Sequence, residues 1–240
     1  MKDFKEIIKD IKSVKIQGAE NIAKASMKAL MNHFSGKKIK TSEAFFKKFN
    51  AACSKLESAR PTEPLLRNSI NFVKITIGKS GTPEELVSKL FSACRQTLYH
   101  YETTEEEIFE IGANKIKSGM KIFTHCHSSS VVGVLLKAKE QGKKFEVYNT
   151  ETRPLFQGRK TVKDMVKAKI PIKHFVDSGA NIALKECDLM LIGSDAITSS
   201  GHVINKIGSE MFAMVAEKHN VPVYVCADSW KFDPKTVYGA

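Results

Sequence analysis

The spacing of apolar residues changes near the middle of this 240-residue sequence. In the first half, apolar side chains recur every three or four positions, as Phe4, Ile7, Ile8 and Ile11 do, and this is the spacing of amphipathic helices. From Met120 onward, short apolar runs of strand length alternate with helical stretches. Because buried strands separated by helices are typical of βαβ units, the second half is predicted to form a parallel sheet.

The pattern predicts an α/β protein with two domains. In the first half, the expected helices lie at residues 3–13, 18–34, 65–77 and 104–117, with further helix starts at Thr41 and Pro83. In the second half, the expected strands lie at residues 120–124, 145–149, 172–176, 189–192 and 221–226. The helices expected between them lie at residues 129–141, 161–167, 180–185 and 209–219. Residues 1–117 are therefore expected to form a helical N-terminal domain, and residues 118–240 a Rossmann-like domain with a doubly wound sheet.

Composition excludes several classes of protein. No apolar stretch approaches the length of a membrane span, and the charged start of the sequence does not resemble a signal peptide. The five cysteines form no CxxC pair, which indicates reduced thiols and a cytoplasmic protein without a membrane partner.

The net charge of +12 is distributed over both halves of the chain. Residues 1–120 hold 21 basic and 14 acidic side chains, and residues 121–240 hold 17 and 12. The excess of basic residues would be explained by lysine-rich helix faces exposed to solvent, or by a site that binds an anionic ligand. Nucleic acid is not an expected partner, because no aromatic and basic residues interleave and no known reader motif is present.

Polar residues follow every predicted strand of the second half. In an open parallel sheet, ligands bind beyond the carboxyl ends of the strands, so these residues should meet at one edge. The segments concerned are residues 124–130, 151–158, 177–178, 193–195, 205–209 and 228–229.

Cys126 and Asp195 are the candidates for chemistry at this edge. Cys126 precedes a predicted helix and has a histidine on either side, and both features favour a thiolate that acts as nucleophile, base or metal ligand. A buried structural cysteine is the alternative. A metal site at residues 125–127 is disfavoured, because adjacent residues of an extended segment point to opposite faces and no further ligands follow at zinc-like spacing. Asp195 is interpreted as an acid or base, or as a helix cap.

Three groups could hold a phosphate. Ser128 and the serines after it begin a helix, whose N-terminal N–H groups bind anions, although the same serines would serve as caps. Arg153 precedes a proline, which keeps its backbone extended and presents the guanidinium from a stiff loop. Lys206 stands two residues before Gly208. Taken singly, Arg153 and Lys206 could equally be surface residues.

The motifs together resemble those of one family. It contains the ribose-1,5-bisphosphate isomerases, the methylthioribose-1-phosphate isomerases, and the alpha, beta and delta subunits of translation initiation factor 2B. The run THCHS at residues 124–128 is most similar to the archaeal ribose-1,5-bisphosphate isomerases. The other motifs that carry the resemblance are KIQGAENIA at residues 15–23, SARPT at 58–62, TRP at 152–154 with QG at 157–158, GSD at 193–195 and NKIG at 205–208.

The resemblance implies an aldose–ketose isomerase that converts ribose 1,5-bisphosphate to ribulose 1,5-bisphosphate in nucleotide (AMP) salvage. A methylthioribose-1-phosphate isomerase and a non-catalytic initiation factor 2B-like regulatory subunit are the alternatives. The family's catalytic pair falls on Cys126 and Asp195. The resemblance further implies a homo-oligomer, either a dimer or a hexamer, that needs no metal and no other cofactor. The expected substrate-binding residues are Gln17, Gly18, Ala19, Arg60, Ser128, Arg153, Gln157, Asn205 and Lys206.

Two features depart from the family pattern. The first motif normally reads Arg-Gly-Ala, so Gln17 removes a cationic contact to the substrate phosphate. Family members also usually run several dozen residues beyond the Trp230–Pro234 region, whereas this sequence ends at Ala240. The resemblance implies that this tail helps to close the sheet and the subunit interface.

The expected mechanism follows from the substrate. A sugar phosphorylated at its anomeric carbon has no free aldehyde, so the ring must open with acid help before a proton moves between C2 and C1. Cys126, as a thiolate, is assigned as the base at carbon, and Asp195 as its partner acid or base, although the two roles can be exchanged.

Overall fold

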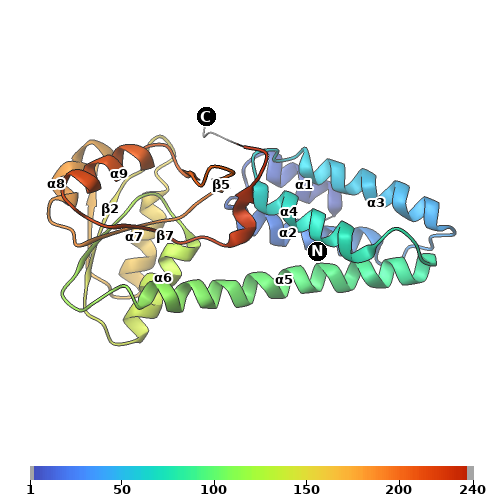
Figure 1. Cartoon of the computed structure of the whole chain (residues 1–240), viewed down its shortest axis with the longest axis horizontal. Helices are drawn as coiled ribbons and strands as arrows, with labels where there is room; N and C mark the ends of the chain where they lie inside the picture. Colours follow the sequence, from blue (N-terminus) through green and yellow to red (C-terminus); the bar gives the residue numbers. More distant parts are fainter. Residues whose placement is uncertain (1–2, 237–240) are drawn as a thin grey trace. The chain divides into compact units, whose positions relative to one another are not determined.

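The structure is a computed structural model that describes residues 3–236 (Figure 1). The chain divides into two compact units, and each is described by itself. The first unit holds the residues up to Thr103, together with Thr198–Ser200 and the segment from Ser229. The second unit holds Thr104–Ile197 and Gly201–Asp228.

Helices build the first unit, as the sequence predicted. They are α1 (Phe4–Lys12), α2 (Ala19–Phe34), α3 (Ser42–Glu57), α4 (Pro64–Ile77) and the first part of α5 (Pro83–Ala113). Asp3 and Glu6 form a capping box on α1, and the Thr41 hydroxyl caps α3. The rings of Phe34, Phe45 and Phe49 pack against one another in a fully buried core.

The segment from Ser229 packs on α4 and α5, a contact that the sequence did not predict. It forms a short 3₁₀ turn, η2 (Ser229–Lys231), and the two-residue strand β8 (Phe232–Asp233). The Asn68 amide donates to the carbonyls of Trp230 and Phe232 at 2.7 and 2.8 Å, and the Trp230 ring stacks on His100 with centroids 4.1 Å apart. Contacts between residues so far apart in the chain leave no periodic signal in the sequence.

One prediction for the first half is wrong in detail. The stretch 104–117 is not a helix of its own, because α5 runs unbroken from Pro83 to Ala113. The predicted boundary at 117/118 lies just before the first strand, whereas the second unit begins within α5, at Thr104. The reason is packing, since Ile108, Phe109 and Ala113 of α5 join the core of the second unit.

The second unit is built on a five-stranded parallel sheet, as predicted. Its strands are β1 (Lys121–Thr124), β2 (Glu146–Thr150), β3 (Ile172–Phe175), β4 (Leu189–Ile192) and β7 (Val223–Val225). They lie in the order β3-β2-β1-β4-β7 and are all parallel. The order reverses between β1 and β4, where Thr124 pairs with Leu191.

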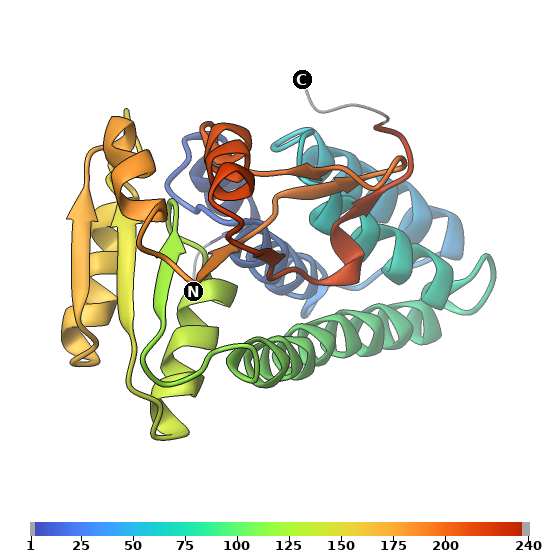
Figure 2. The same ribbon diagram turned by 60° about the vertical axis from the view of Figure 1, so that its left-hand side comes forward.

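Helices cover both faces of this sheet (Figure 2). Neighbouring residues of one strand point to opposite faces, so Ile122 joins the core beneath α6 (Ser129–Glu140) and α7 (Gly158–Lys167). Phe123 joins the core beneath α8 (Ala180–Leu184), which follows the 3₁₀ turn η1 (Asp177–Gly179), and α9 (Ser209–Lys218). Strands that are apolar on both faces explain the continuous hydrophobic runs in the sequence.

The sequence missed a short hairpin after β4. The strands β5 (Ala196–Thr198) and β6 (Val203–Ile204) pair antiparallel, with Ala196 opposite Ile204. Two strands of three and two residues give too little alternation to be recognised. No helix within residues 3–236 is long and apolar enough to cross a membrane.

Candidate active site

The reversal of strand order places two predicted catalytic residues on adjacent loops. Cys126 lies two residues beyond β1, and Asp195 lies three residues beyond β4. In a doubly wound sheet, the crevice that binds ligands opens between the loops at such a reversal. The order of the strands, which the sequence did not show, therefore selects these two loops among all those at the edge.

The Cys126 loop is held in an uncommon conformation. Cys126 has φ +67°, in the left-handed region that favours glycine, and Thr152 on the next loop has φ +64°. The Thr152 hydroxyl oxygen accepts a hydrogen bond from the Cys126 N–H at 3.0 Å, and the Thr161 hydroxyl donates to the Cys126 carbonyl at 2.9 Å. Such strain persists only where surrounding contacts impose it, and it concentrates at functional sites.

The environment of Cys126 contradicts one expectation. The surroundings were expected to favour a thiolate, but burial raises the pKa of the Cys126 thiol above its ordinary value. The His127 N–H and the charges of Lys206 and Lys160 lower this pKa, and the charge of Asp195 raises it, without reversing the effect of burial. The two flanking histidines supply no positive charge, because burial lowers the pKa of both. The Cys126 thiol is therefore protonated at neutral pH.

The Asp195 loop approaches the start of α6. A side chain on Gly193 would meet the Ser128 hydroxyl, because a Cβ built there lies 2.5 Å from Ser128 Oγ. Glycine at this position thus allows the end of β4 to lie against the Cys126 loop. Asp195 itself is half-buried, and its backbone N–H donates to the Ile204 carbonyl at 2.8 Å.

Ser128 serves as the N-cap of α6, the alternative to a phosphate ligand. Its hydroxyl oxygen accepts from the Val131 N–H at 3.4 Å. A role for Ser128 in phosphate binding stays a prediction.

The loop after β6 brings Asn205 and Lys206 to the same edge. Both are half-buried, and the Asn205 amide donates to the Ser209 hydroxyl at 2.9 Å. The charge of Lys206 acts on both His125 and Cys126. These side chains therefore lie within electrostatic range of the thiol, as the sequence predicted for one sheet edge.

Arg153 is presented from a loop that Asp177 holds. The Asp177 carboxylate accepts from the N–H groups of Thr152 and Arg153 at 2.9 and 2.8 Å. The Arg153 side chain is exposed, and its guanidinium lies 4.8 Å from the centre of the Phe156 ring. Gln157 ends this loop as the N-cap residue of α7, and its side chain makes no capping bond.

The other predicted substrate ligands lie in the first unit. Gly18 has φ +87° and precedes α2, whose first residue, Ala19, is buried. The Gln17 amide donates to the Val14 carbonyl at 2.9 Å. Arg60 faces Glu63 with Nε 3.5 Å from the carboxylate oxygen.

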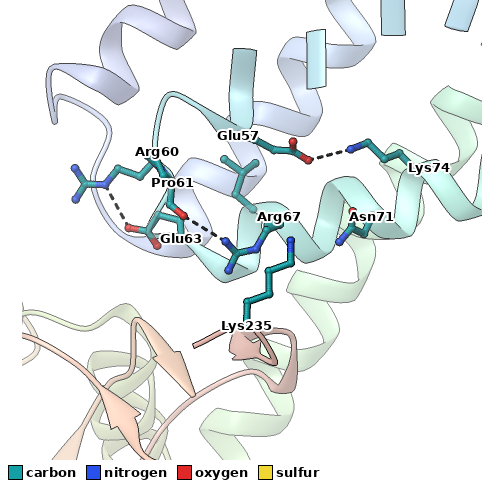
Figure 3. Close-up of a pocket in the computed structure, with 9 residues that line it drawn as sticks. Glu57, Arg60, Pro61, Glu63, Arg67, Asn71, Lys74 and Lys235 are labelled. Carbon is teal, nitrogen blue, oxygen red and sulfur yellow. Dashed lines mark hydrogen bonds and ion pairs between the residues drawn. The ribbon is translucent and has the colours of Figure 1, made fainter. Parts of the chain in front are cut away.

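Arg60 also lines a cavity of about 290 Å³ in the first unit (Figure 3). Three other cationic side chains line it, and two of them are paired, Arg67 with Asp233 at 2.8 Å and Lys74 with Glu57 at 3.0 Å. The complete lining is Glu57, Arg60, Pro61, Glu63, Leu66, Arg67, Asn71, Lys74 and Lys235. Carboxylates of the protein thus pair with three of the four cationic groups at this cavity, and a role for Arg60 in binding phosphate stays a prediction.

Sequence reasoning placed Thr152 and Asp177 in the polar segments at this edge without giving them a supporting role, and it did not single out Thr150. Their signal was their position at or after predicted strands. Their partners are set by the packing of neighbouring strands. Within the described part of the chain, no group of three or more His, Cys, Asp or Glu side chains is arranged to hold a metal ion.

Comparison with known proteins identifies the family. A model of the Initiation factor 2 subunit family matches residues 15–240. The chain belongs to this family. The ribose 1,5-bisphosphate isomerase of Pyrococcus furiosus is 37% identical over 238 residues, which cover 98% of this chain and 74% of that protein.

Two other members show the breadth of the family. The methylthioribose-1-phosphate isomerase of Syntrophus aciditrophicus is 29% identical, over 98% of this chain and 72% of that protein. The crystal structure of translation initiation factor eIF-2B from Pyrococcus horikoshii superposes with a TM-score of 0.87 at 26% identity, over 96% of this chain and 80% of that one. The family resemblance and the fold predicted from the sequence are thereby confirmed, and this member of the family is an isomerase.

Proposed function

We propose that this chain converts ribose 1,5-bisphosphate to ribulose 1,5-bisphosphate. The observation that supports this most is the placement of Cys126 and Asp195 on the two loops where the strand order reverses. The 37% identity to a protein of that name supports the choice of substrate. The cationic residues Lys160 and Lys206, whose charges act on Cys126, suit a substrate that carries phosphate.

The reaction needs an acid and a base on one substrate. An acid protonates the ring oxygen while the bond from that oxygen to C1 breaks. A base removes the proton from C2, which leaves an enol with a double bond between C1 and C2. A proton then adds to C1, and the C2 hydroxyl loses its proton to give the ketone. Every proton removed is returned, so no redox cofactor enters the balance.

The protonation state of Cys126 favours one assignment of these roles. Because burial raises its pKa, the thiol can donate the first proton to the ring oxygen. The Asp195 carboxylate then accepts the proton from C2, and Cys126, now a thiolate, is the group that must be reprotonated. This assignment exchanges the two roles that the sequence suggested. Ser128, Arg153 and Lys206 of the second unit are proposed to bind the phosphates.

The purified chain should form ribulose 1,5-bisphosphate in buffer that contains a chelator and no added metal. Proton transfer between carbon atoms needs only the acid and base named above. The measurement is product formation by nuclear magnetic resonance, with methylthioribose 1-phosphate as the competing substrate in a parallel reaction. Activity that depends on a divalent ion would contradict the mechanism, and faster turnover of the methylthio compound would contradict the proposed substrate.

We further propose that the chain forms a homo-oligomer, at least a dimer. In the second unit, β7 is an edge strand of the sheet and its residue Tyr224 is 41% exposed, and an exposed edge strand can pair with another chain. Light scattering at micromolar concentration should give a mass of at least twice 26.7 kDa. A clean monomer mass would refute the proposal.

A further inference from the structure

His125 is a buried residue that the proposed mechanism does not use. Its side chain is 2% exposed, and its ring packs edge-on against Phe212 with centroids 4.5 Å apart. Both ring nitrogens have partners on other segments of the second unit. Nδ1 lies 2.6 Å from the Thr150 hydroxyl at the end of β2, and Nε2 lies 2.9 Å from the Ile207 carbonyl after β6.

These partners determine the state of the ring. A carbonyl oxygen can only accept, so Nε2 carries a hydrogen and donates it to Ile207. Burial lowers the pKa of His125, so the imidazole is neutral and Nδ1 accepts from the Thr150 hydroxyl. Because both ring nitrogens are hydrogen-bonded and the ring packs against Phe212, the His125 ring has a single orientation.

This bond is one of the contacts that hold the Ile207 segment, beside the Ser209 N–H, which donates to the Lys206 carbonyl at 3.0 Å. The Ile207 side chain is 78% exposed, so burial of that side chain does not hold the segment in place. The next residue, Gly208, has φ +96°, and a Cβ built there would lie 3.5 Å from His125 Nε2 and 3.2 Å from the Phe212 ring. Glycine therefore allows the backbone to turn closely over the histidine.

Lys206 immediately precedes Ile207, so the same bond constrains it. The charge of Lys206 is felt at both His125 and Cys126, so its ammonium lies within electrostatic range of both side chains. Building on the function proposed above, we propose that His125 is a positioning residue. Its bond to the Ile207 carbonyl holds Lys206 beside Cys126, where the ammonium binds a phosphate of the substrate.

Two substitutions separate the two bonds of His125. In His125→Gln, the amide nitrogen replaces Nε2 and can still donate to the Ile207 carbonyl. In His125→Asn, the amide lies near the Nδ1 position, whose partners are the Thr150 hydroxyl at 2.6 Å and the Thr152 hydroxyl at 3.4 Å, and it does not reach Ile207. We expect His125→Asn to raise KM about tenfold, the effect of one lost hydrogen bond to a charged group, with kcat changed less than about threefold. His125→Gln should bring KM back to within about threefold of the original value.

A second measurement needs no substrate. The rate at which iodoacetamide alkylates Cys126 at pH 7 depends on the thiolate fraction, which the charge of Lys206 increases. If the pKa of the Cys126 thiol rises by one unit, the thiolate fraction falls tenfold. The more basic thiolate is also a better nucleophile, which recovers about half of that loss on a logarithmic scale. We therefore expect alkylation about threefold slower in His125→Asn and in Lys206→Met. Since no sugar phosphate is present, this result is independent of the proposed function.

A double-mutant cycle decides whether His125 acts through Lys206. In the Lys206→Met background, His125→Asn should change neither KM nor the alkylation rate further. His125→Phe keeps the ring packing and loses both bonds. It replaces His125→Asn in the cycle if His125→Asn fails to fold. Phe212→Leu reduces the ring packing and keeps both hydrogen bonds of His125, so it is the packing control and should raise KM less than His125→Asn does. The proposal would be overturned by additive effects in the cycle, by an equal increase of KM in His125→Gln and His125→Asn, or by faster alkylation in His125→Asn.

Discussion

Replacing Cys126 with serine, or Asp195 with asparagine, should lower turnover at least about a hundredfold, the low end for a positioned acid or base. Serine keeps the size and hydrogen bonding of cysteine, but its hydroxyl is far too weak an acid to take its place. Asparagine keeps the shape of aspartate and cannot exchange a proton. Steady-state kinetics with ribose 1,5-bisphosphate measures both changes.

The double variant should lose little more than the worse single variant, because groups that serve one proton relay are not additive. Substrate binding should survive in all three variants, since other residues are proposed to hold the phosphates. Cys187→Ser and Asp188→Asn are the matched controls. Cys187 is buried near α8, and Asp188 accepts from the Lys121 N–H at the opposite end of β1, so neither change should affect turnover.

Two outcomes would show that Cys126 and Asp195 do not act as partners in one proton relay. Losses that multiply in the double variant would mean that the two residues act in independent steps. Near-normal turnover of Cys126→Ser would make this cysteine a structural thiol. In either case, the assignment of acid and base proposed above would have to be abandoned.

Gly158→Ala should destabilise the protein by about 3 kcal/mol, the upper part of the range for overpacking. A Cβ at this position would lie 1.9 Å from the Thr150 carbonyl oxygen, and the backbone of a central strand has little freedom to move away. Gly158 also fixes the end of β2, because its carbonyl accepts from the buried Asn149 amide at 2.9 Å. The free energy of unfolding, measured with urea, tests this change.

Gly179→Ala is the control for this experiment. Gly179 lies in the same unit at an ordinary negative φ, and the nearest atoms to a Cβ built there are 3.7 Å away. Its free energy of unfolding should change by less than about 1 kcal/mol. If the two alanine variants unfold at the same urea concentration, the protein accommodates a Cβ at position 158, and the predicted destabilisation is wrong.

Much of the fold could be predicted because its signals are local. Amphipathic spacing located most helices of the first unit, and the start signals at Thr41 and Pro83 located two of their starts. Short apolar runs of strand length, separated by helical stretches, located all five strands of the parallel sheet. Parallel strands also place their carboxyl ends at one edge, so the order of strands and loops along the chain was enough to predict that the segments that carry Cys126, Asp195 and Lys206 lie at one edge of the sheet.

The sequence by itself thus determined the family, the sheet and the edge at which the chemistry collects, because each depends on residues close together in the chain. Only the tertiary structure decided how that edge works. Strand order selects the Cys126 and Asp195 loops, and His125 connects residues from β2 to the Lys206 loop. The tertiary structure also decided the protonation state of Cys126. Its helix and its neighbouring histidines suggested a thiolate, but burial, which depends on how the whole unit packs, keeps the proton on the sulfur.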